Sequence, residues 1–252
     1  MRPEGQPDAR YFAVMAEVAS SHWWYVARRD LFRQLLAGRV SAGATALDVG
    51  CGTGETMAVL RELGASRVAG TDLSDDALGH ARRQGANGAV MAALAEQLPF
   101  GDGVADVLVS SDVLEHLDDD RSGLREYRRV LRDGGTLLVT VPSYQWLWGP
   151  HDEAAGHRRR YGSGQLATVV AGSGFRVERA SAFFSFLVPA AAAVRRTPLG
   201  RLVSDSDDEA SAGAAATAVF GRLGRLERAV LRRRDIPFGL SQFVVATAVD
   251  QP

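Results

Sequence analysis

The residues best suited to chemistry lie in the stretch Ala46-Leu47-Asp48-Val49-Gly50-Cys51-Gly52-Thr53-Gly54-Glu55. An apolar run ends there, and three alternating glycines follow an acidic residue. Glycine tolerates unusual backbone angles and the close approach of a ligand. Open α/β folds bind ligands at the carboxyl ends of their strands. The pattern therefore predicts a strand-to-helix turn that faces a ligand.

The glycine spacing narrows the class of ligand. Dinucleotide sites use G-x-G-x-x-G, and phosphate loops continue into G-K-[ST]. Here the order is G-x-G-x-G followed by Glu55. A carboxylate at the start of a helix disfavours a pyrophosphate there. The sequence thus favours a ligand without phosphate but with a cationic or zwitterionic end.

A second acidic residue follows the next predicted strand. Asp72 comes directly after residues 67–71, 24 positions beyond Asp48. That distance is typical of a carboxylate that accepts hydrogen bonds from the two hydroxyls of a ribose. Capping of the following helix is the alternative role.

These stretches resemble motif I and its surroundings in the class I S-adenosylmethionine-dependent methyltransferases. A later stretch, Leu94-Ala95-Glu96-Gln97-Leu98-Pro99-Phe100, resembles the family segment D-A-E-x-L-P-F that contacts adenine. Leu94 stands where the family has Asp, which removes a side-chain acceptor for the adenine amino group. The resemblance implies S-adenosylmethionine as cofactor, bound by Arg28, Asp48, Gly50, Cys51, Gly52, Asp72, Leu73, Ala95, Glu96 and Ser110.

Three histidines are candidates for the catalytic base. His116 follows the predicted strand 104–110, which in the family passes under the methyl donor. Imidazole has an ordinary pKa of about 6.5, which suits proton removal from an acceptor. His151 and His157 lie in the next long loop, and a purely structural role for these rings is the alternative. The spacing of His151, Asp152 and His157 matches no specific metal site, so we predict no metal.

The loop 142–162 combines aromatic and basic side chains, as specificity loops do. Together with His22-Trp23-Trp24-Tyr25, its His157-Arg158-Arg159-Arg160-Tyr161 stretch resembles a bacterial subgroup of small-molecule methyltransferases. That resemblance implies an N-terminal helix that closes over the cofactor, with Arg28 on the methionine carboxylate. Ordinary packing of the aromatic rings and a solvated charge run are the alternatives. The predicted substrate residues are Asp112, Tyr144, Trp146, Arg158, Arg159 and Tyr161.

Composition excludes several other functions. The net charge of −1 gives no basic excess for nucleic acid. All 29 basic residues are arginine, so Schiff-base and lysine general-base mechanisms are absent. The single cysteine, Cys51, excludes a disulfide framework. Residues 1–10 show no signal-peptide pattern, and the apolar run 181–194 is too short to span a bilayer. We expect a cytoplasmic chain with a small-molecule substrate and no stable membrane insertion; a homodimer remains possible.

Strand and helix patterns alternate from residue 44 onward, which predicts an α/β fold with a parallel sheet. The methyltransferase resemblance implies a Rossmann-like seven-stranded sheet whose last strand is antiparallel. We expect one domain over 1–252, with a helical cap (1–42), a core (43–184 and 236–250) and a helical insertion (185–235) that contains an acidic stretch at 204–211. The expected strands are 44–49, 67–71, 89–93, 104–110, 136–141, 175–184 and 243–249.

The sequence thus predicts methyl transfer from S-adenosylmethionine to a small molecule, most simply O-methylation of a secondary-metabolite, sugar or lipid-like acceptor. Two other classes stay open. One is a non-methylating enzyme on the same fold, such as a cyclase or pericyclic catalyst. The other is a catalytically silent partner subunit.

Overall fold

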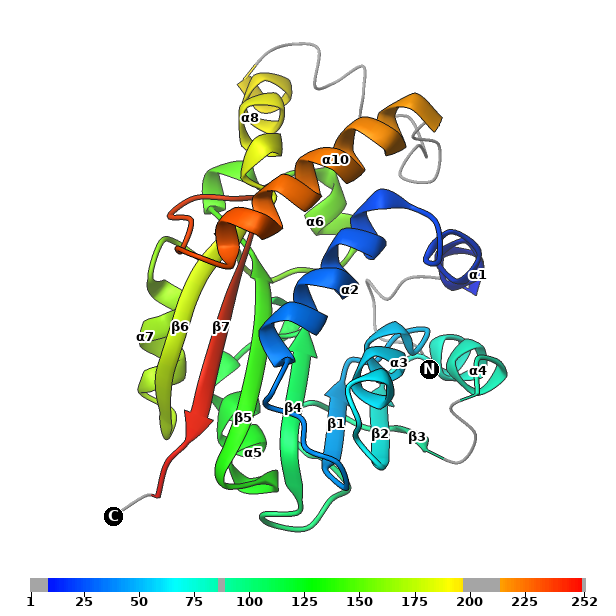
Figure 1. Cartoon of the computed structure of the whole chain (residues 1–252), viewed down its shortest axis with the longest axis vertical. Helices are drawn as coiled ribbons and strands as arrows, with labels where there is room; N and C mark the ends of the chain where they lie inside the picture. The colour runs from blue at the N-terminus through cyan, green and yellow to red at the C-terminus, as the bar shows by residue number, and fades with distance from the viewer. Residues whose placement is uncertain (1–8, 86–88, 197–213, 251–252) are drawn as a thin grey trace.

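A single seven-stranded sheet forms the centre of the protein (Figure 1). The computed structural model describes residues 9–85, 89–196 and 214–250, so the acidic stretch 204–211 lies outside the described residues. The strand order is β3-β2-β1-β4-β5-β7-β6. The strands are β1 (Thr45–Val49), β2 (Arg67–Asp72), β3 (Val90–Ala92), β4 (Ala105–Ser111), β5 (Leu131–Pro142), β6 (Phe175–Phe183) and β7 (Ser241–Ala248).

The strand directions bring the carboxyl ends of six strands to one edge of the sheet. The pairs β1–β2, β2–β3, β1–β4 and β4–β5 are parallel, whereas β7 runs antiparallel to both β5 and β6. The predicted fold class, including the antiparallel last strand, is therefore confirmed. Because only β7 is reversed, the other six strands end at the same edge, where the glycine turn also lies.

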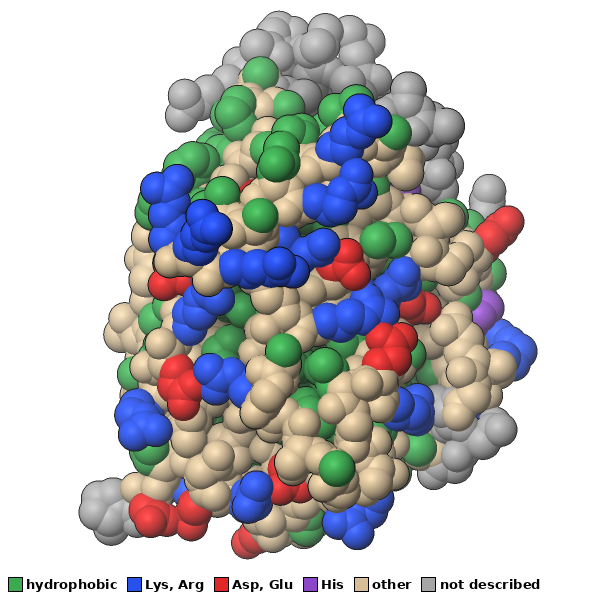
Figure 2. Space-filling model, viewed as in Figure 1, with side chains coloured by type: hydrophobic (Ala, Val, Ile, Leu, Met, Phe, Trp, Pro, Cys, Tyr) green, Lys and Arg blue, Asp and Glu red, His purple; other side chains and the backbone are tan. Residues whose placement is uncertain are grey.

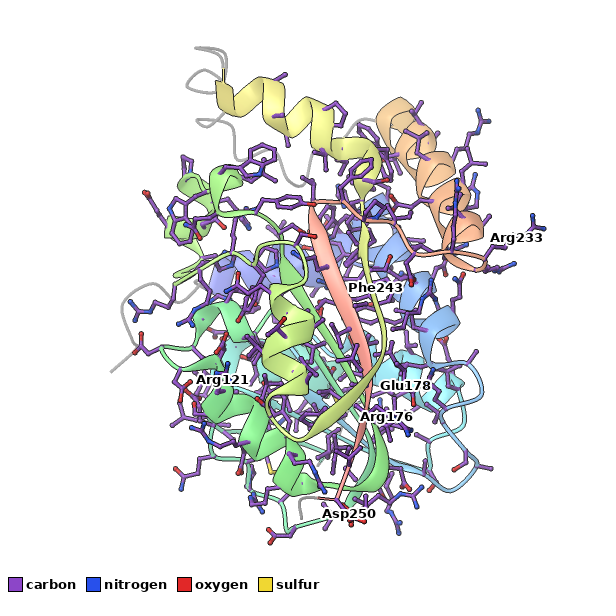
Figure 3. The ribbon with its side chains drawn as sticks, turned by 90° about the vertical axis from the view of Figure 1, so that its left-hand side faces the viewer. Arg121, Arg176, Glu178, Arg233, Phe243 and Asp250 are labelled. Carbon is purple, nitrogen blue, oxygen red and sulfur yellow. The ribbon has the colours of Figure 1, made fainter. Side chains whose placement is uncertain are left out.

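Helices cover both faces of this sheet. Those described are α1 (Ala9–Val18), α2 (Trp23–Leu36), α3 (Glu55–Glu62), α4 (Asp75–Arg83), α5 (Asp120–Val130), α6 (Pro150–Ala154), α7 (Gln165–Ala171), α8 (Val188–Arg196) and α10 (Ala214–Leu231), with short 3-10 turns η1 (Leu114–His116), η2 (Gln145–Leu147) and η3 (Ser185–Leu187). Seen along the sheet, α5 and α7 lie on one side and α2 and α10 on the other (Figure 3).

Side chains alternate between the two layers, as the period of two in a strand requires. On β4, Val107 and Val109 pack in the core cluster beneath α2, α3 and α4. Leu108 packs in the opposite cluster, against Leu124 and Tyr127 of α5. Both clusters are apolar, so the central strands are buried on both faces, as their near-continuous apolar sequences predict.

Each of the seven predicted strands differs from the structure in at least one limit, and two of these differences have a cause in the backbone. The strand expected at 136–141 extends over Leu131–Pro142, although its pairing with β4 skips from Leu131 to Thr136. The strand expected to reach Phe184 ends at Phe183, because the φ angle of Phe184 is +57° and breaks the ladder. Each of these two differences marks a local change of backbone direction that apolar patterning alone does not reveal.

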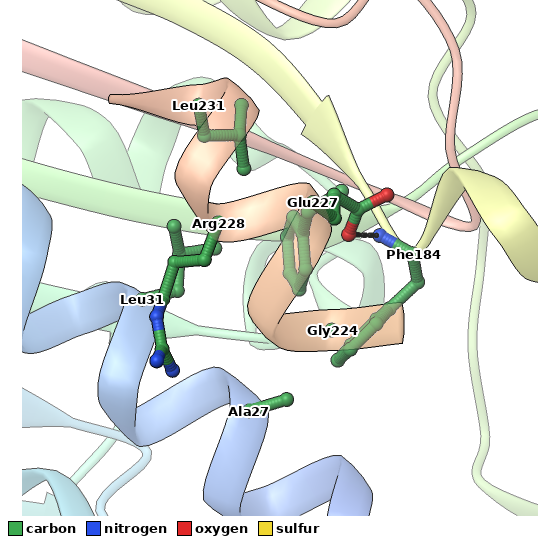
Figure 4. A pocket seen from close by; sticks show the side chains of 8 residues that line it. Ala27, Leu31, Phe184, Gly224, Glu227, Arg228 and Leu231 are labelled. Atoms are coloured by element: carbon green, nitrogen blue, oxygen red, sulfur yellow. Dashed lines mark hydrogen bonds between the residues drawn. The ribbon is translucent and has the colours of Figure 1, made fainter. Parts of the chain in front are cut away.

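The carboxylate of Glu227 joins the insertion to the sheet edge. Glu227 lies on α10, is buried, and accepts hydrogen bonds from the backbone N–H groups of Phe184 (2.6 Å) and Ser185 (2.7 Å) (Figure 4). Helix α10 also packs along α2, where Arg228 forms an ion pair with Asp30. These contacts position the insertion over the N-terminal cap.

The face formed by α2 and α10 carries rows of basic side chains with acidic ones between them (Figure 2). Two cavities open between these helices. The smaller, of about 10 Å³, is lined by Glu227 and Leu231 among others, and the larger, of about 160 Å³, by Trp23 and Arg225 among others. Neither includes a residue of the glycine turn, so we attribute both to helix packing. Among the described residues, no helix is long and apolar enough to cross a membrane.

We predict that Glu227→Ala lowers the free energy of unfolding by about 2–4 kcal/mol, because two backbone N–H groups lose their acceptor. Urea unfolding followed by circular dichroism measures the change. The matched control is Leu226→Ala at the adjacent, exposed position, for which we expect a change within about 0.5 kcal/mol. Equal effects of the two substitutions would contradict the anchoring role.

Candidate functional site

The turn between β1 and α3 is shaped by glycines. Gly50, Gly52 and Gly54 have φ angles of +71°, +52° and +95°, which side-chain-bearing residues rarely adopt. A Cβ atom on Gly50 would overlap the side chain of Val113, whereas one on Gly52 would meet nothing within 4 Å. Gly50 is therefore required for packing, and Gly52 leaves open space against bare backbone.

Asp48 is the least compensated charge beside this turn. It is buried, and its Oδ2 atom has no hydrogen-bond partner among the described residues. Burial, together with the neighbouring Asp72 carboxylate, raises the pKa of Asp48 to about 7, while Arg28 opposes the shift. Burial of an acceptor that has no donor among the described residues costs free energy.

Asp72 ends β2 as predicted, and it structures the turn. Its Oδ2 accepts from the Gly52 N–H and its Oδ1 from the Ser74 N–H, both at 2.9 Å. Burial raises the pKa of Asp72, and these hydrogen bonds oppose the rise. The N-cap of α4 is Ser74, which accepts from Ala77. Asp72 is therefore not the capping residue, and each of its oxygens retains a lone pair for a ligand.

Two leucines form exposed apolar surface next to Asp72. Leu73 and Leu94 follow the paired strands β2 and β3 and are 49% and 50% exposed. Ala95 is buried and Glu96 is half-buried beside them. The departure from the family pattern at Leu94 thus replaces a polar acceptor by apolar surface, which suits the face of a flat aromatic ring.

Two predicted site residues lie inside the core. Ser110 is fully buried on the α5 side of β4, with its hydroxyl 3.0 Å from that of Tyr127. Tyr161 is fully buried and donates to Asp120 at 2.8 Å. Neither side chain has a free surface for a ligand, so we leave both outside the proposed site.

Arg28 connects the N-terminal cap to the end of β4. Its Nη1 donates to Asp112 Oδ2 at 2.8 Å, and Asp112 also accepts from Ser111 and Thr140. Asp112 has a φ angle of +56°, which is strained for a residue with a side chain. The predicted pairing of Arg28 with a methionine carboxylate stays a prediction; in this structure its partner is Asp112.

The N-terminal helical cap also supplies a positive charge to Glu55, the residue that follows the three glycines. Arg29 of α2 forms an ion pair with Glu55, the first residue of α3. Arg29 was not among the predicted site residues. The sequence shows Arg29 only as one of two adjacent arginines on a predicted helix. The partners of these arginines depend on how that helix packs against the rest of the protein.

The three predicted catalytic histidines lie together. The ring centroids of His116 and His157 are 4.8 Å apart, and those of His151 and His157 are 6.0 Å apart. Asp152 Oδ1 lies 2.8 Å from His157 Nδ1. Burial and the neighbouring His157 lower the pKa of His116 to about 4, so its ring is neutral at physiological pH.

Asp152 connects the segments of this cluster. It is fully buried and accepts from the Gly149 N–H at 2.9 Å and from Arg160 Nε at 2.7 Å, besides its contact with His157. Burial alone would raise its pKa, but the hydrogen bonds with His157 and Arg160 bring the pKa below its ordinary value. Asp152 is therefore an ionised group that orients His157.

Glu115 is a buried acid that sequence reasoning missed. It is fully buried in η1, and both of its carboxylate oxygens lack a partner among the described residues. Burial, with repulsion from Asp112, raises its pKa well above the ordinary value. The only signal in the sequence is a carboxylate inside the otherwise apolar stretch Val113-Leu114-Glu115.

The remaining predicted substrate residues line the loop after β5. Tyr144, with a φ angle of +61°, stacks on Trp146, which is 48% exposed. Arg159 donates to the carbonyls of Leu117 and Asp118, so it fastens the loop to η1. Arg158 is the more open of the two, with a side chain 59% exposed and a 3.4 Å ion pair to Asp118.

Comparison with known proteins gives this site a context. Residues 47–139 match the family model described as methyltransferase domain. A probable S-adenosylmethionine-dependent methyltransferase of Mycolicibacterium smegmatis is 31% identical over 163 residues, which are 64% of this chain and 62% of the relative. Over these residues the chain is similar to S-adenosylmethionine-dependent methyltransferases.

Two further comparisons concern a second curated relative and a solved structure. The malonyl-[acyl-carrier protein] O-methyltransferase of Serratia marcescens is 37% identical over 115 residues, which are 45% of each chain. The chain thus spans less than two thirds of the length of these curated relatives. A solved chain from the complex of the Haloferax volcanii Trm112 methyltransferase activator superposes with a TM-score of 0.64 at 20% identity, covering 96% of both chains. That likeness shows the methyltransferase fold.

We predict that Asp48→Asn stabilises the protein at high pH. The native state keeps the Asp48 proton up to pH about 7, whereas the unfolded chain loses it near 3.8. The wild type therefore loses stability between these two values, and the variant does not. The gap in free energy of unfolding should be small at pH 4 and reach on the order of 2–4 kcal/mol at pH 8.

Urea unfolding at pH 4, 6 and 8 measures this gap. Asp102→Asn, at a side chain 81% exposed, serves as the control and should change stability by less than about 0.5 kcal/mol at every pH. A gap for Asp48→Asn that does not grow with pH would refute the assignment of a buried, uncompensated carboxylate.

Proposed function

We propose that this chain transfers the methyl group of S-adenosylmethionine to a small-molecule acceptor. The observation that carries the proposal is the orphaned, buried oxygen of Asp48 beside the open space at Gly52. A ligand with a cationic amino group next to a flat nucleoside complements both features. The family match over residues 47–139 supports the same assignment.

The surrounding residues fit the parts of this cofactor in order. Asp48 accepts from the amino group of the methionine part, and Gly52 gives the ligand access to the backbone. Asp72 accepts from the ribose hydroxyls with its remaining lone pairs. Leu73 and Leu94 then cover the faces of the adenine ring. When bound, S-adenosylmethionine supplies an electrophilic methyl group on a sulfonium.

The acceptor site lies at the ends of β4 and β5. Asp112 directly follows β4, Tyr144 lies two residues after β5, and both have strained backbone angles. Such strain costs about 1–3 kcal/mol per residue and tends to occur at functional sites. Trp146 and the histidine cluster complete the walls. Alignment of the acceptor with the methyl carbon is the main catalytic contribution that such a site makes.

We propose an oxygen acceptor. The ring of His116, which is neutral at physiological pH, lies beside His157 and offers a nitrogen that can accept a proton from a hydroxyl group. The O-methyltransferase of Serratia marcescens named above acts on an acyl group carried by a protein.

We predict that S-adenosylhomocysteine binds with micromolar affinity in titration calorimetry. Gly52→Ala should weaken binding at least about tenfold, because its methyl group enters the ligand space. Gly134→Ala is the matched control, since Gly134 has a similar φ of +75°, also with nothing within 4 Å of its Cβ position, but lies at the opposite end of β5. Affinity should fall as the pH drops below about 7, because a proton on Asp48 competes with the ligand cation.

Failure of the wild type to bind S-adenosylhomocysteine at millimolar concentration would overturn the proposed function. Binding without methyl transfer to any panel acceptor would favour the non-methylating enzyme. Equal affinities of Gly52→Ala and Gly134→Ala would place the cofactor elsewhere.

We also predict that Arg158→Ala raises KM for an anionic acceptor by about tenfold while leaving kcat within twofold, because an exposed arginine contributes binding and not alignment. Arg121→Ala on the surface of α5 is the control. Steady-state assays of S-adenosylhomocysteine release measure both constants. An unchanged KM would exclude Arg158 from acceptor recognition.

A further inference from the structure

Three metal-ligating side chains converge beside the acceptor site. One ligand atom each from Glu115, His116 and His157 lies within 4.8 Å of the other two. Bonds from a divalent ion to nitrogen or oxygen measure about 2.1 Å, so three ligands spread evenly around one ion lie roughly 3.4–3.6 Å apart. Side-chain rotations that draw these atoms together by roughly 1–1.5 Å would therefore bring all three onto a common ion.

The second ring nitrogen of each histidine is already occupied. His157 Nδ1 lies 2.8 Å from Asp152 Oδ1, which leaves its Nε2 atom to face the cluster. One nitrogen of His116 donates to the backbone of Gly156. Metal-binding histidines typically make such contacts to a carboxylate or a carbonyl, which fix the ring orientation.

Glu115 provides an independent indication that a ligand belongs here. Its two carboxylate oxygens are buried and lack any partner in the described part of the chain. Buried carboxylates normally receive several hydrogen bonds or coordinate a metal. The backbone also fastens the two segments together, because the Arg158 N–H donates to the Glu115 carbonyl at 2.7 Å.

We propose that Glu115, His116 and His157 bind a divalent transition-metal ion. Two imidazoles and one carboxylate form a donor set that suits Zn²⁺, Fe²⁺ or Mn²⁺ better than Mg²⁺ or Ca²⁺, which prefer oxygen ligands. Three protein ligands leave open coordination positions. His116 and His157 are partly exposed, so a small molecule can approach the ion from their side.

Such an ion would deepen the proposed function, on which this step rests. An acceptor oxygen bound at an open position loses its proton more readily, because the ion stabilises the anion. That oxygen then forms a bond to the methyl carbon while the carbon–sulfur bond breaks, and the electron pair stays on sulfur. The proton passes to His151, which lies next to His157 and is exposed. His116 and His157 would then act as ligands and not as bases.

Titration of untagged, EDTA-treated full-length protein with Co²⁺ tests the inference without cofactor or acceptor. We expect one saturable site with visible absorption bands characteristic of nitrogen and oxygen ligands, and displacement of Co²⁺ by Zn²⁺. Glu115→Gln and His157→Gln should each weaken binding by about 100-fold, more than loss of an outer contact usually does. His80→Gln, on α4 and outside the cluster, should bind like the wild type.

Circular dichroism verifies that each variant folds, and His116→Gln provides a second route if one does not. Absence of saturable binding by the wild type, or equal affinity of Glu115→Gln and the wild type, would overturn the metal site. Calorimetry with S-adenosylhomocysteine is measured separately. Loss of metal binding with cofactor binding intact would therefore reject this inference alone, and the reverse result would reject the proposed function alone.

Discussion

The buried carboxylate of Asp48 is the constraint around which the rest of the site is arranged. Burial makes this group costly to ionise, so the native state keeps its proton up to a pH of about 7. The protein compensates the charge of Asp48 only in part. Arg28 is close enough to lower the pKa of Asp48, but it pairs directly with Asp112. The turn at Gly52 leaves open space against the backbone. An incompletely compensated carboxyl group of this kind supports the proposal of a ligand with a positive charge.

The cover over this site depends on contacts between distant parts of the chain. Helix α2 contributes Arg28 and Arg29 to the ends of β4 and α3. The position of α2 is in turn fixed by α10, through the ion pair of Asp30 with Arg228. Glu227, one residue earlier on α10, fastens that helix to the end of β6. The insertion thus contacts the helical cap and the end of β6 without contributing a residue to the glycine turn.

The loop after β5 has a different organising centre. Asp152 is buried with its charge satisfied by Arg160, the Gly149 N–H and His157. This network gives the loop one defined shape and places His157 beside His116 from η1. The neighbouring Glu115 has no such compensation. One satisfied and one unsatisfied carboxylate thus stand next to the same pair of rings, and that asymmetry distinguishes a positioning group from a ligand group.

The sequence by itself determined the alternating fold, the glycine turn and the acid at the end of β2, because these depend on local patterns and on strand order. The sequence also pointed to His116, His151 and His157, which the structure brings together. Tertiary structure alone decided which face of a strand a side chain occupies. It places the side chain of Ser110 on the α5 side of β4 and brings Glu115, which was not among the predicted site residues, beside His116 and His157. Burial and the partners of a charge are set by segments far away in the chain. No spacing rule encodes them, and only packing of the complete sheet, cap and insertion fixes them.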